Sequence, residues 1–345
     1  MSFIAENIQT FLICGFLAVG LLLVFVPICK YVGIVDKPDE RKVHVGNIPL
    51  IGGFCIFLTS LIAVTYAQSF GYLSLLILGT GSLIMLIGIV DDLADVNPKN
   101  RLLLQLLITA ATAHFFGLQI TTLGTFFGLP LSLELGIFSL PFTVVVVVGL
   151  TNAFNMIDGC DGLAGSLSFL AICAIAFLGV QPPEPEMSLL MLSLGAGLLV
   201  FLCFNIPAVF TFKVFLGDSG SLFLGYAISW MLIYSFERVK SMEPSFALWI
   251  VLIPLFDFLY VFISRLKVGR SVIQGDRSHL HHHLISHGLN HQKTTALIFM
   301  MSLLLLIVGL FFERVFPSLS LPIFGLLFIL YFYGRICVAE KTLTS

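Results

Sequence analysis

Charge is scarce in this sequence. Only 10% of the 345 residues are Asp, Glu, Lys or Arg, whereas 58% are hydrophobic. Soluble domains carry about 25% charged residues, so the composition excludes a soluble globular protein. Between Ile48 and Val90 the sequence has no charged residue at all. A helix needs about 20 apolar residues to cross a bilayer, and the chain is therefore expected to be an integral membrane protein.

The cysteines show no pairing pattern. There are seven of them, an odd number, and most lie inside apolar runs. This argues against a disulfide framework or a zinc site, and the cysteines are expected to be small core residues. A positively charged segment ahead of the first apolar run is also missing. That run is long enough to remain as an anchor, so no cleaved signal peptide is expected.

The apolar runs predict an all-α bundle of about eleven membrane-spanning helices in a single domain, 1–345. The run 48–90 is too long for one helix and breaks at residues 68–71, which gives two spans. Alternating residues at 123–136 predict a small external hairpin. The remaining nine expected spans are 7–29, 101–117, 135–157, 162–183, 187–212, 219–236, 244–264, 294–312 and 315–334.

The basic residues predict the orientation of this bundle. Fourteen of the seventeen Lys and Arg residues lie in the odd-numbered loops and at the C-terminus. Positive residues favour the cytoplasmic side, so these loops and the C-terminus are expected in the cytoplasm, with the N-terminus outside. Every unusual polar cluster falls on the same side, which predicts one assembled site. The clusters are Asp91, Asp92 and Asp95 on loop three, Asp158 and Asp161 on loop five, Asp218 on loop seven, and the histidines of 279–283 on loop nine.

The segment "TNAFNMIDGCDGL" (151–163) places four polar side chains three residues apart. On a helix end this spacing gives a stripe of amides and carboxylates, followed by glycines that permit a tight turn. Helix caps explain one or two such residues but not four, so a functional role is favoured. The four are Asn152, Asn155, Asp158 and Asp161.

The segment "VFLGDSGSLFLG" (214–225) begins a span with Asp218 between glycines. An N-cap is one interpretation, and taken alone it is the better one. The other is a metal or phosphate position, because a helix N-terminus favours anions.

The run "DRSHLHHHL" (276–284) is either a transition-metal site or a solvated surface segment. Together with nearby arginines it forms a basic loop facing the acids. Phosphate oxygens and a divalent cation between the two would relieve the repulsion among the carboxylates. Oxygen ligands favour Mg²⁺, with Mn²⁺ as an alternative.

Five motifs in this order resemble the polyprenyl-phosphate N-acetylhexosamine-1-phosphate transferase family, in its bacterial undecaprenyl-phosphate N-acetylglucosamine branch, over nearly the whole chain. They are "DKPDERKVHVGNIPLIGG" (36–53), "DDLAD" (91–95), "NAFNMIDGCDGL" (152–163), "VFLGDSGS" (214–221) and "DRSHLHHH" (276–283).

The resemblance implies a magnesium enzyme on the cytoplasmic face of the bacterial inner membrane, with Mn²⁺ as a possible substitute. The enzyme would transfer N-acetylglucosamine 1-phosphate from UDP-N-acetylglucosamine to undecaprenyl phosphate and release UMP. The lipid-linked product would start O-antigen, common antigen or a related surface polysaccharide. No nucleic-acid partner is expected, and a homodimer is left open.

The resemblance also implies roles for individual residues. Asp218 and Asn155 correspond to metal ligands. The residues that correspond to the catalytic group are Asp91, Asp92, Asp158, Asp161 and His279. Those that correspond to substrate-binding positions are Lys42, His44, Arg101, Asn152, Arg265, His281, His282 and His283.

Two alternatives remain open at this point. The first is the same reaction with another UDP-N-acetyl sugar of the fucosamine, quinovosamine or MurNAc-pentapeptide type. The second is a multi-span transporter, although carriers place their sites near the midplane, whereas these acids lie at helix ends. Asp257 lies well inside a span and is either functional or a helix-packing hydrogen-bond partner.

Overall fold

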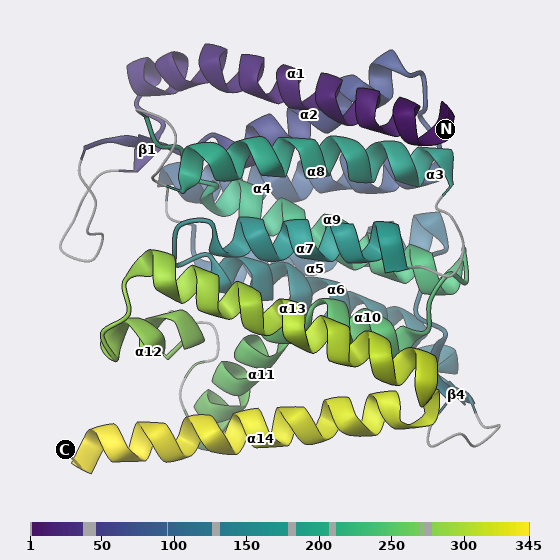
Figure 1. The fold of residues 1–345 in the computed structure, drawn as a ribbon, viewed down its shortest axis with the longest axis vertical. Coiled ribbons are helices and arrows are strands. Elements are labelled where there is room, and N and C mark those ends of the chain that lie inside the picture. The colour runs from purple at the N-terminus through teal and green to yellow at the C-terminus, as the bar shows by residue number, and fades with distance from the viewer. Residues whose placement is uncertain are drawn as a thin grey trace.

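The computed structural model describes residues 2–36, 46–94, 96–125, 132–178, 184–206, 212–269, 271 and 278–344. Helices account for most of this chain and lie side by side, with the N- and C-termini at opposite ends (Figure 1). The helices are α1 (Ser2–Val32), α2 (Gly52–Tyr66), α3 (Tyr72–Ser74), the π-helix η1 (Leu75–Thr80), α4 (Gly81–Ala94), α5 (Pro98–Phe116), the 3-10 helix η2 (Gly136–Phe138), α6 (Ser139–Ile157), α7 (Leu163–Leu178), α8 (Pro185–Asn205), α9 (Gly217–Glu237), α10 (Pro244–Ile250), α11 (Leu252–Lys267), α12 (Leu280–Ser286), α13 (His291–Val315) and α14 (Pro317–Thr344).

These helices confirm the predicted all-α membrane bundle. Seven helical segments of the described chain are long and apolar enough to cross a membrane, and the bent pair α10–α11 raises the number to eight. The two shorter apolar helices α2 and α7 also fall on predicted spans, and so does α5. The count of eleven, the orientation and the single domain stay predictions.

Helix α9 is the centre of the bundle. Its whole apolar segment is buried, whereas less than a third of the equivalent segments of α1, α13 and α14 is buried. A helix that is apolar all round belongs either in a protein core or in lipid. The bundle contains helices of both types. Helix α9 is a core helix that packs against α2, α4, α6 and α7. The outer helices α1, α13 and α14 present apolar side chains to their surroundings.

Glycines allow the neighbours of α9 to approach it closely. A Cβ on Gly53 of α2 would lie 2.0 Å from the Cα of Gly220. A Cβ on Gly88 of α4 would lie 2.3 Å from the Cα of Ser219. Small residues at helix contacts let backbones pack without intervening side chains. The first turn of α9 is therefore held directly between α2 and α4.

The strand β2 (Ile48–Pro49) pairs with β1 (Val35–Asp36), and the chain at its end lies beside the segment that precedes α9. Phe215 donates its backbone N–H to Pro49 at 2.9 Å, and Gly52 donates to Phe215 at 2.9 Å. The predicted hairpin is confirmed in part, since β3 (Thr122–Thr125) and β4 (Ser132–Glu134) pair antiparallel. The residues between these two strands lie outside the described chain.

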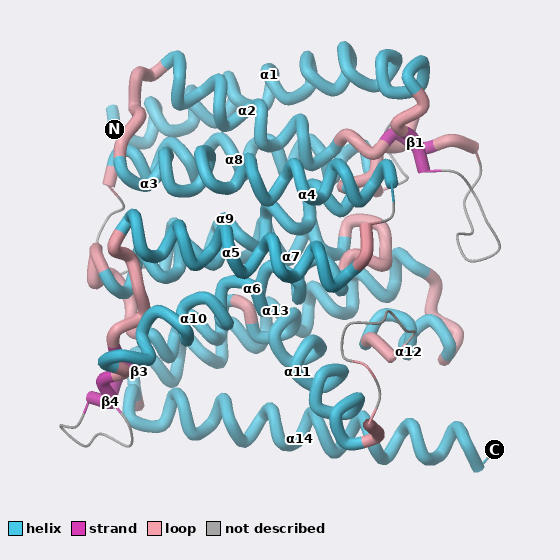
Figure 2. Tube along the Cα trace, turned by 180° about the vertical axis from the view of Figure 1, so that it is seen from behind, coloured by secondary structure: helices cyan, strands magenta, loops and turns pink. Residues whose placement is uncertain are grey.

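The span predicted at 244–264 is bent. Helices α10 and α11 meet at an angle of 84°, and α11 runs obliquely from α10 towards α14 (Figure 2). The cause is Pro254, whose ring would clash with the carbonyl four residues earlier in a continuous helix. Val251 accordingly leaves the helical conformation, with φ −110° and ψ 21°.

Candidate functional site

Asp218 lies in the first turn of α9 and faces Asn155 of α6. The Asn155 side-chain amide donates to Asp218 Oδ1 at 2.7 Å and to Ser221 Oγ at 3.0 Å. The side chain of Asp218 is 42% exposed, so its second oxygen is accessible from the end of the bundle. The two residues that the resemblance assigns to a metal are therefore neighbours.

Asp92, at the end of α4, caps α9 from outside. It accepts hydrogen bonds from the backbone N–H groups of Asp218 at 2.8 Å and Ser219 at 3.2 Å. A carboxylate at this position satisfies helix donors and complements the positive end of the helix dipole. Gly217 has φ +77°, and a Cβ there would lie 2.7 Å from Asp92 Oδ2, so the turn requires glycine.

Asp91 is buried and paired with Arg101. It accepts from the backbone N–H of Val96 at 2.8 Å and forms a close ion pair with Nη1 of Arg101. The same nitrogen lies 3.8 Å from Asp218 Oδ2. One guanidinium thus stands between two carboxylates from loops three and seven.

Asp158 and Asp161 bring the acidic loop after α6 to the same place. Burial raises the pKa of the Asp158 carboxyl to about 8, helped by the negative charges of Asp218 and Asp92. Asp161 forms an ion pair with Lys213 Nζ at 2.6 Å. Because each added carboxylate disfavours ionisation of the others, loops three, five and seven create a site with excess negative charge.

Residues 279–283, the histidine segment, pack against the acidic loop that carries Asp158 and Asp161. A Cβ on Gly159 would lie 2.0 Å from Nε2 of His281, so the ring rests on the glycine backbone. Burial, together with the charge of His282, lowers the pKa of His281 to about 3. The ring of His279 lies parallel to that of His281, with centroids 5.9 Å apart. Loops three, five, seven and nine therefore meet, as the sequence predicted.

Other predicted residues lie further from these contacts. The Asn152 amide donates to Gln105 Oε1 at 2.6 Å, inside the helix interface rather than at the acids. The His283 ring contacts His287, with centroids 4.4 Å apart. Arg265 is buried in the last turn of α11. Lys42 and His44 lie outside the described residues, as does Asp95.

Two residues that the sequence pattern does not single out, Ser221 and Gln105, contact the predicted amides. Ser221 could have been found from its spacing, because it follows Asp218 by three residues and shares its helix face. Gln105 carried a weaker signal, as one polar residue within a predicted span. Its side chain is fully buried, and such a position marks either a packing contact or a functional one.

Comparisons with known proteins agree with the five motifs. The family model described as glycosyl transferase family 4 matches residues 74–236, a range that contains all five aspartates of the acidic site. Three relatives match most of the chain. The undecaprenyl-phosphate alpha-N-acetylglucosaminyl 1-phosphate transferase of Yersinia pestis is 34% identical over 88% of this chain and 84% of its own length. The protein of the same name from Escherichia coli K12 is 32% identical over 95% and 90%. A Bacillus subtilis relative, named as a probable undecaprenyl-phosphate N-acetylglucosaminyl 1-phosphate transferase, is 33% identical over 93% and 89%.

This likeness extends over nearly the full length of both chains. It confirms the resemblance inferred from the motifs. The chain belongs to glycosyl transferase family 4, among the phospho-sugar transferases that act at membranes.

Proposed function

We propose that the protein transfers N-acetylglucosamine 1-phosphate from UDP-N-acetylglucosamine to undecaprenyl phosphate. An oxygen of the lipid phosphate bonds to the sugar-linked phosphorus, and the phosphoanhydride bond to UMP breaks. One anhydride replaces another, so no ATP is needed. The observation that carries the proposal is the contact of Asn155, Asp92 and Arg101 with the first turn of α9. The names of the relatives support the two substrates.

Asp218 and Asn155 fit a magnesium ion by their chemistry. Among the described residues, no three His, Cys, Asp or Glu side chains form a group that could hold a metal on their own. Magnesium differs from metals held in all-protein cages, because it keeps several waters and uses one or two carboxylates together with substrate phosphates. One accessible carboxylate oxygen and one amide oxygen match that mode, and manganese accepts the same ligands. The bound ion would neutralise phosphate charge beside the acids.

The protein side chains position the two phosphates. Arg101 and Lys213 place two cations beside the aspartates of the site. The ammonium of Lys213 also lies 4.9 Å from the ring centre of Phe215. The lipid phosphate has its second pKa near about 6 and is mostly dianionic already, so the reaction needs no strong base. Asp91 and Asp92 are engaged with Arg101 and the start of α9. We therefore assign them to positioning, as in other phosphoryl transfers.

The remaining roles follow the family resemblance. Asp158 and Asp161 belong beside the nucleotide. The histidine segment, with Arg265, closes on the sugar diphosphate, and Lys42 and His44 are further phosphate contacts. The distribution of Lys and Arg supports a cytoplasmic active-site face in a bacterial inner membrane.

The product nucleotide tests the reaction. Purified protein in detergent would receive undecaprenyl phosphate, Mg²⁺ and UDP-N-acetylglucosamine, with Asp218→Ala as the inactive control. We expect UMP and a lipid-linked sugar diphosphate, both abolished by EDTA and restored by Mg²⁺ or Mn²⁺. Release of UDP would contradict the proposal, because it would mean transfer of the sugar without its phosphate.

A further inference from the structure

Asp257 is an acid inside the bent span, and its partners lie on two other segments. It is 1% exposed. One oxygen meets Nδ1 of His279 at 2.8 Å, and the other accepts from the backbone N–H of Leu280 at 2.8 Å. Tyr331 and Arg335 of α14 add longer contacts at 3.2 and 3.4 Å. The carboxylate thus joins α11, α14 and the start of the histidine segment.

Arg335 makes this arrangement electrostatically feasible. A buried carboxylate is costly unless a cation pairs with it and hydrogen bonds satisfy it. Arg335 also donates Nη2 to the carbonyl of Ser278 at 2.5 Å and lies 4.5 Å from the ring centre of Tyr260. It therefore holds both the acid and the backbone that leads into His279.

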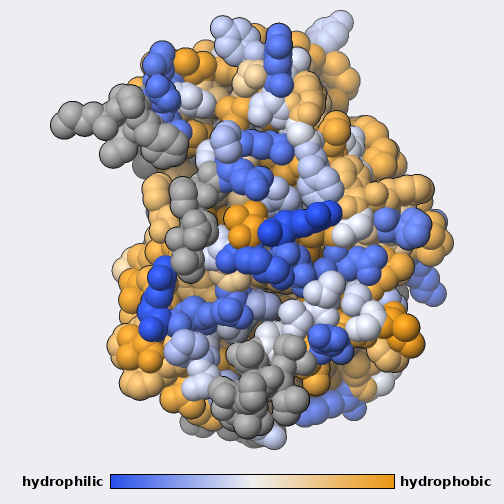
Figure 3. All heavy atoms as spheres, turned by 90° about the vertical axis from the view of Figure 1, so that its right-hand side faces the viewer, coloured by the Kyte–Doolittle hydropathy of each residue, from blue (hydrophilic) through white to orange (hydrophobic). Residues whose placement is uncertain are grey.

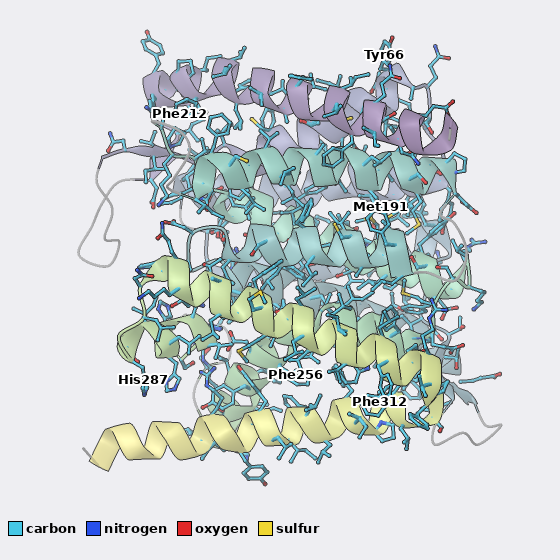
Figure 4. All side chains as sticks on the ribbon, viewed as in Figure 1. Tyr66, Met191, Phe212, Phe256, His287 and Phe312 are labelled. Carbon is cyan, nitrogen blue, oxygen red and sulfur yellow. The ribbon has the colours of Figure 1, made fainter. Side chains whose placement is uncertain are left out.

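A helix-packing role does not account for the shorter contacts. The contacts of Asp257 with the histidine segment are shorter than those with α14. Aromatic contacts already join the two helices, since Phe256 lies 5.0 Å from Phe324 and 5.1 Å from Phe328 between ring centres. Phe256 is labelled between α13 and α14 in Figure 4. The carboxylate therefore acts chiefly on His279.

We propose that Asp257, supported by Arg335, is a positioning residue that orients the imidazole of His279 towards the diphosphate of the donor substrate. This inference rests on the proposed function. With Nδ1 bound to Asp257, only Nε2 of His279 is left for a substrate. The contact with Asp257 fixes the rotation of the ring, so it sets the direction in which Nε2 points. The ring of His279 stacks on that of His281, and His281 packs against Gly159 of the acidic loop. His279 is therefore held beside that loop.

A double-mutant cycle separates positioning from simple support of the fold. The variants are Asp257→Asn, His279→Ala and the pair, assayed by UMP release with kcat and KM measured for UDP-N-acetylglucosamine. We expect Asp257→Asn to lower kcat about 100-fold, with KM changed by less than about five-fold. Because Asp257 acts through His279, the double variant should match His279→Ala within about three-fold.

Two further variants complete the test. Arg335→Lys keeps the charge but cannot bridge Asp257 and Ser278, and it should lower kcat about ten-fold. Phe324→Leu removes one aromatic contact between the same helices and should leave kcat within about three-fold. Thermal unfolding of each variant confirms folding, and Asp257→Glu takes the place of Asp257→Asn in the cycle if the latter does not fold.

The outcomes are distinct. Full activity of the Asp257 variant would overturn the positioning role. So would a double variant in which Asp257→Asn lowers kcat as much as it does when His279 is present. A wild-type protein that releases no UMP would instead overturn the proposed function.

Discussion

The two ends of the bundle carry carboxylates in opposite circumstances. At the end that bears the N-terminus, Glu186 accepts from the backbone N–H and the hydroxyl of Ser74, both at 2.6 Å. Glu237 accepts from the backbone N–H of Thr121 at 2.7 Å. Hydrophilic side chains cover this end, and apolar ones flank it (Figure 3). At the other end Asp92, Asp158 and Asp218 repel one another, and burial with this repulsion raises the pKa of Asp158 to about 8.

The difference shows what distinguishes a structural acid from a functional one here. Each glutamate has donors of its own from a neighbouring segment, so it ties two elements together and its charge is satisfied. The aspartates of the other end share few cations, and their combined charge exceeds that of Arg101 and Lys213. Such an excess is unfavourable until a cation or a proton arrives, as expected of a metal and phosphate site.

The largest expected effect comes from exchanging one acid at each end for its amide. Asp218→Asn should lower the rate of UMP release about 1000-fold or more, because the exposed carboxylate beside Asn155 loses its charge. Glu186→Gln should leave the rate within about three-fold and lower the melting temperature instead. A comparable loss of rate from both variants would remove the distinction between the ends.

The close approach of α4 to α9 gives the next effect. Gly88→Ala would place a Cβ 2.3 Å from the Cα of Ser219, and overpacking of this kind costs about 1–3 kcal/mol. We expect a lower melting temperature together with weaker activity, since the displaced turn carries Asp218. Gly79→Ala is the matched control, because a Cβ there meets no atom within 4 Å. Equal stability of the two variants would contradict the packing described.

The histidine segment should make folding stability depend on pH. The pKa of His281 falls from about 6.5 to about 3 on folding, so between these values the unfolded chain binds one more proton. Stability from this group is present above pH 6.5 and lost as pH falls towards 3, at up to about 1.4 kcal/mol per pH unit.

Unfolding midpoints of detergent-solubilised protein between pH 4.5 and 7.5 measure that dependence. His281→Phe should flatten the curve, whereas the same change at the exposed His287 should not. An unchanged slope in His281→Phe would mean that His281 does not become buried and neutral on folding.

The smallest effect is expected at the edge of the site. Lys213→Gln removes the partner of Asp161 and one cation near the nucleotide, and it should raise KM for the UDP sugar about three- to ten-fold with little change in kcat. Lys240→Gln at the far end, beside Glu237, should change neither constant. If Lys213→Gln lowered kcat by about three- to ten-fold and left KM unchanged, this lysine would act in catalysis and not in binding.

Local signals were enough to predict most of the architecture. Runs of apolar residues specify membrane helices on their own, and the shared side of the polar loops predicted that Asp92, Asp158 and Asp218 would meet. The bend at Val251 was missed although Pro254 marks it, because the apolar run continues through both.

Tertiary contacts decide what the sequence left open. The residue pattern does not show that Asp92 caps a distant helix, that Asn152 turns to Gln105, or that His281 rests on Gly159. From the sequence Asp257 fits either a functional or a packing role, and its short contact with His279 distinguishes the two. Each of these depends on which helices become neighbours, and spacing along the chain does not determine that.

Cation binding tests the central claim most directly. Purified protein would be titrated with Mn²⁺ and the free ion measured by electron paramagnetic resonance, with Asp218→Asn and Glu186→Gln in parallel. We predict one site in the wild type that Glu186→Gln retains and Asp218→Asn weakens at least about ten-fold. Equal binding by Asp218→Asn and the wild type would contradict the assignment of the crowded acidic end as the metal and phosphate site.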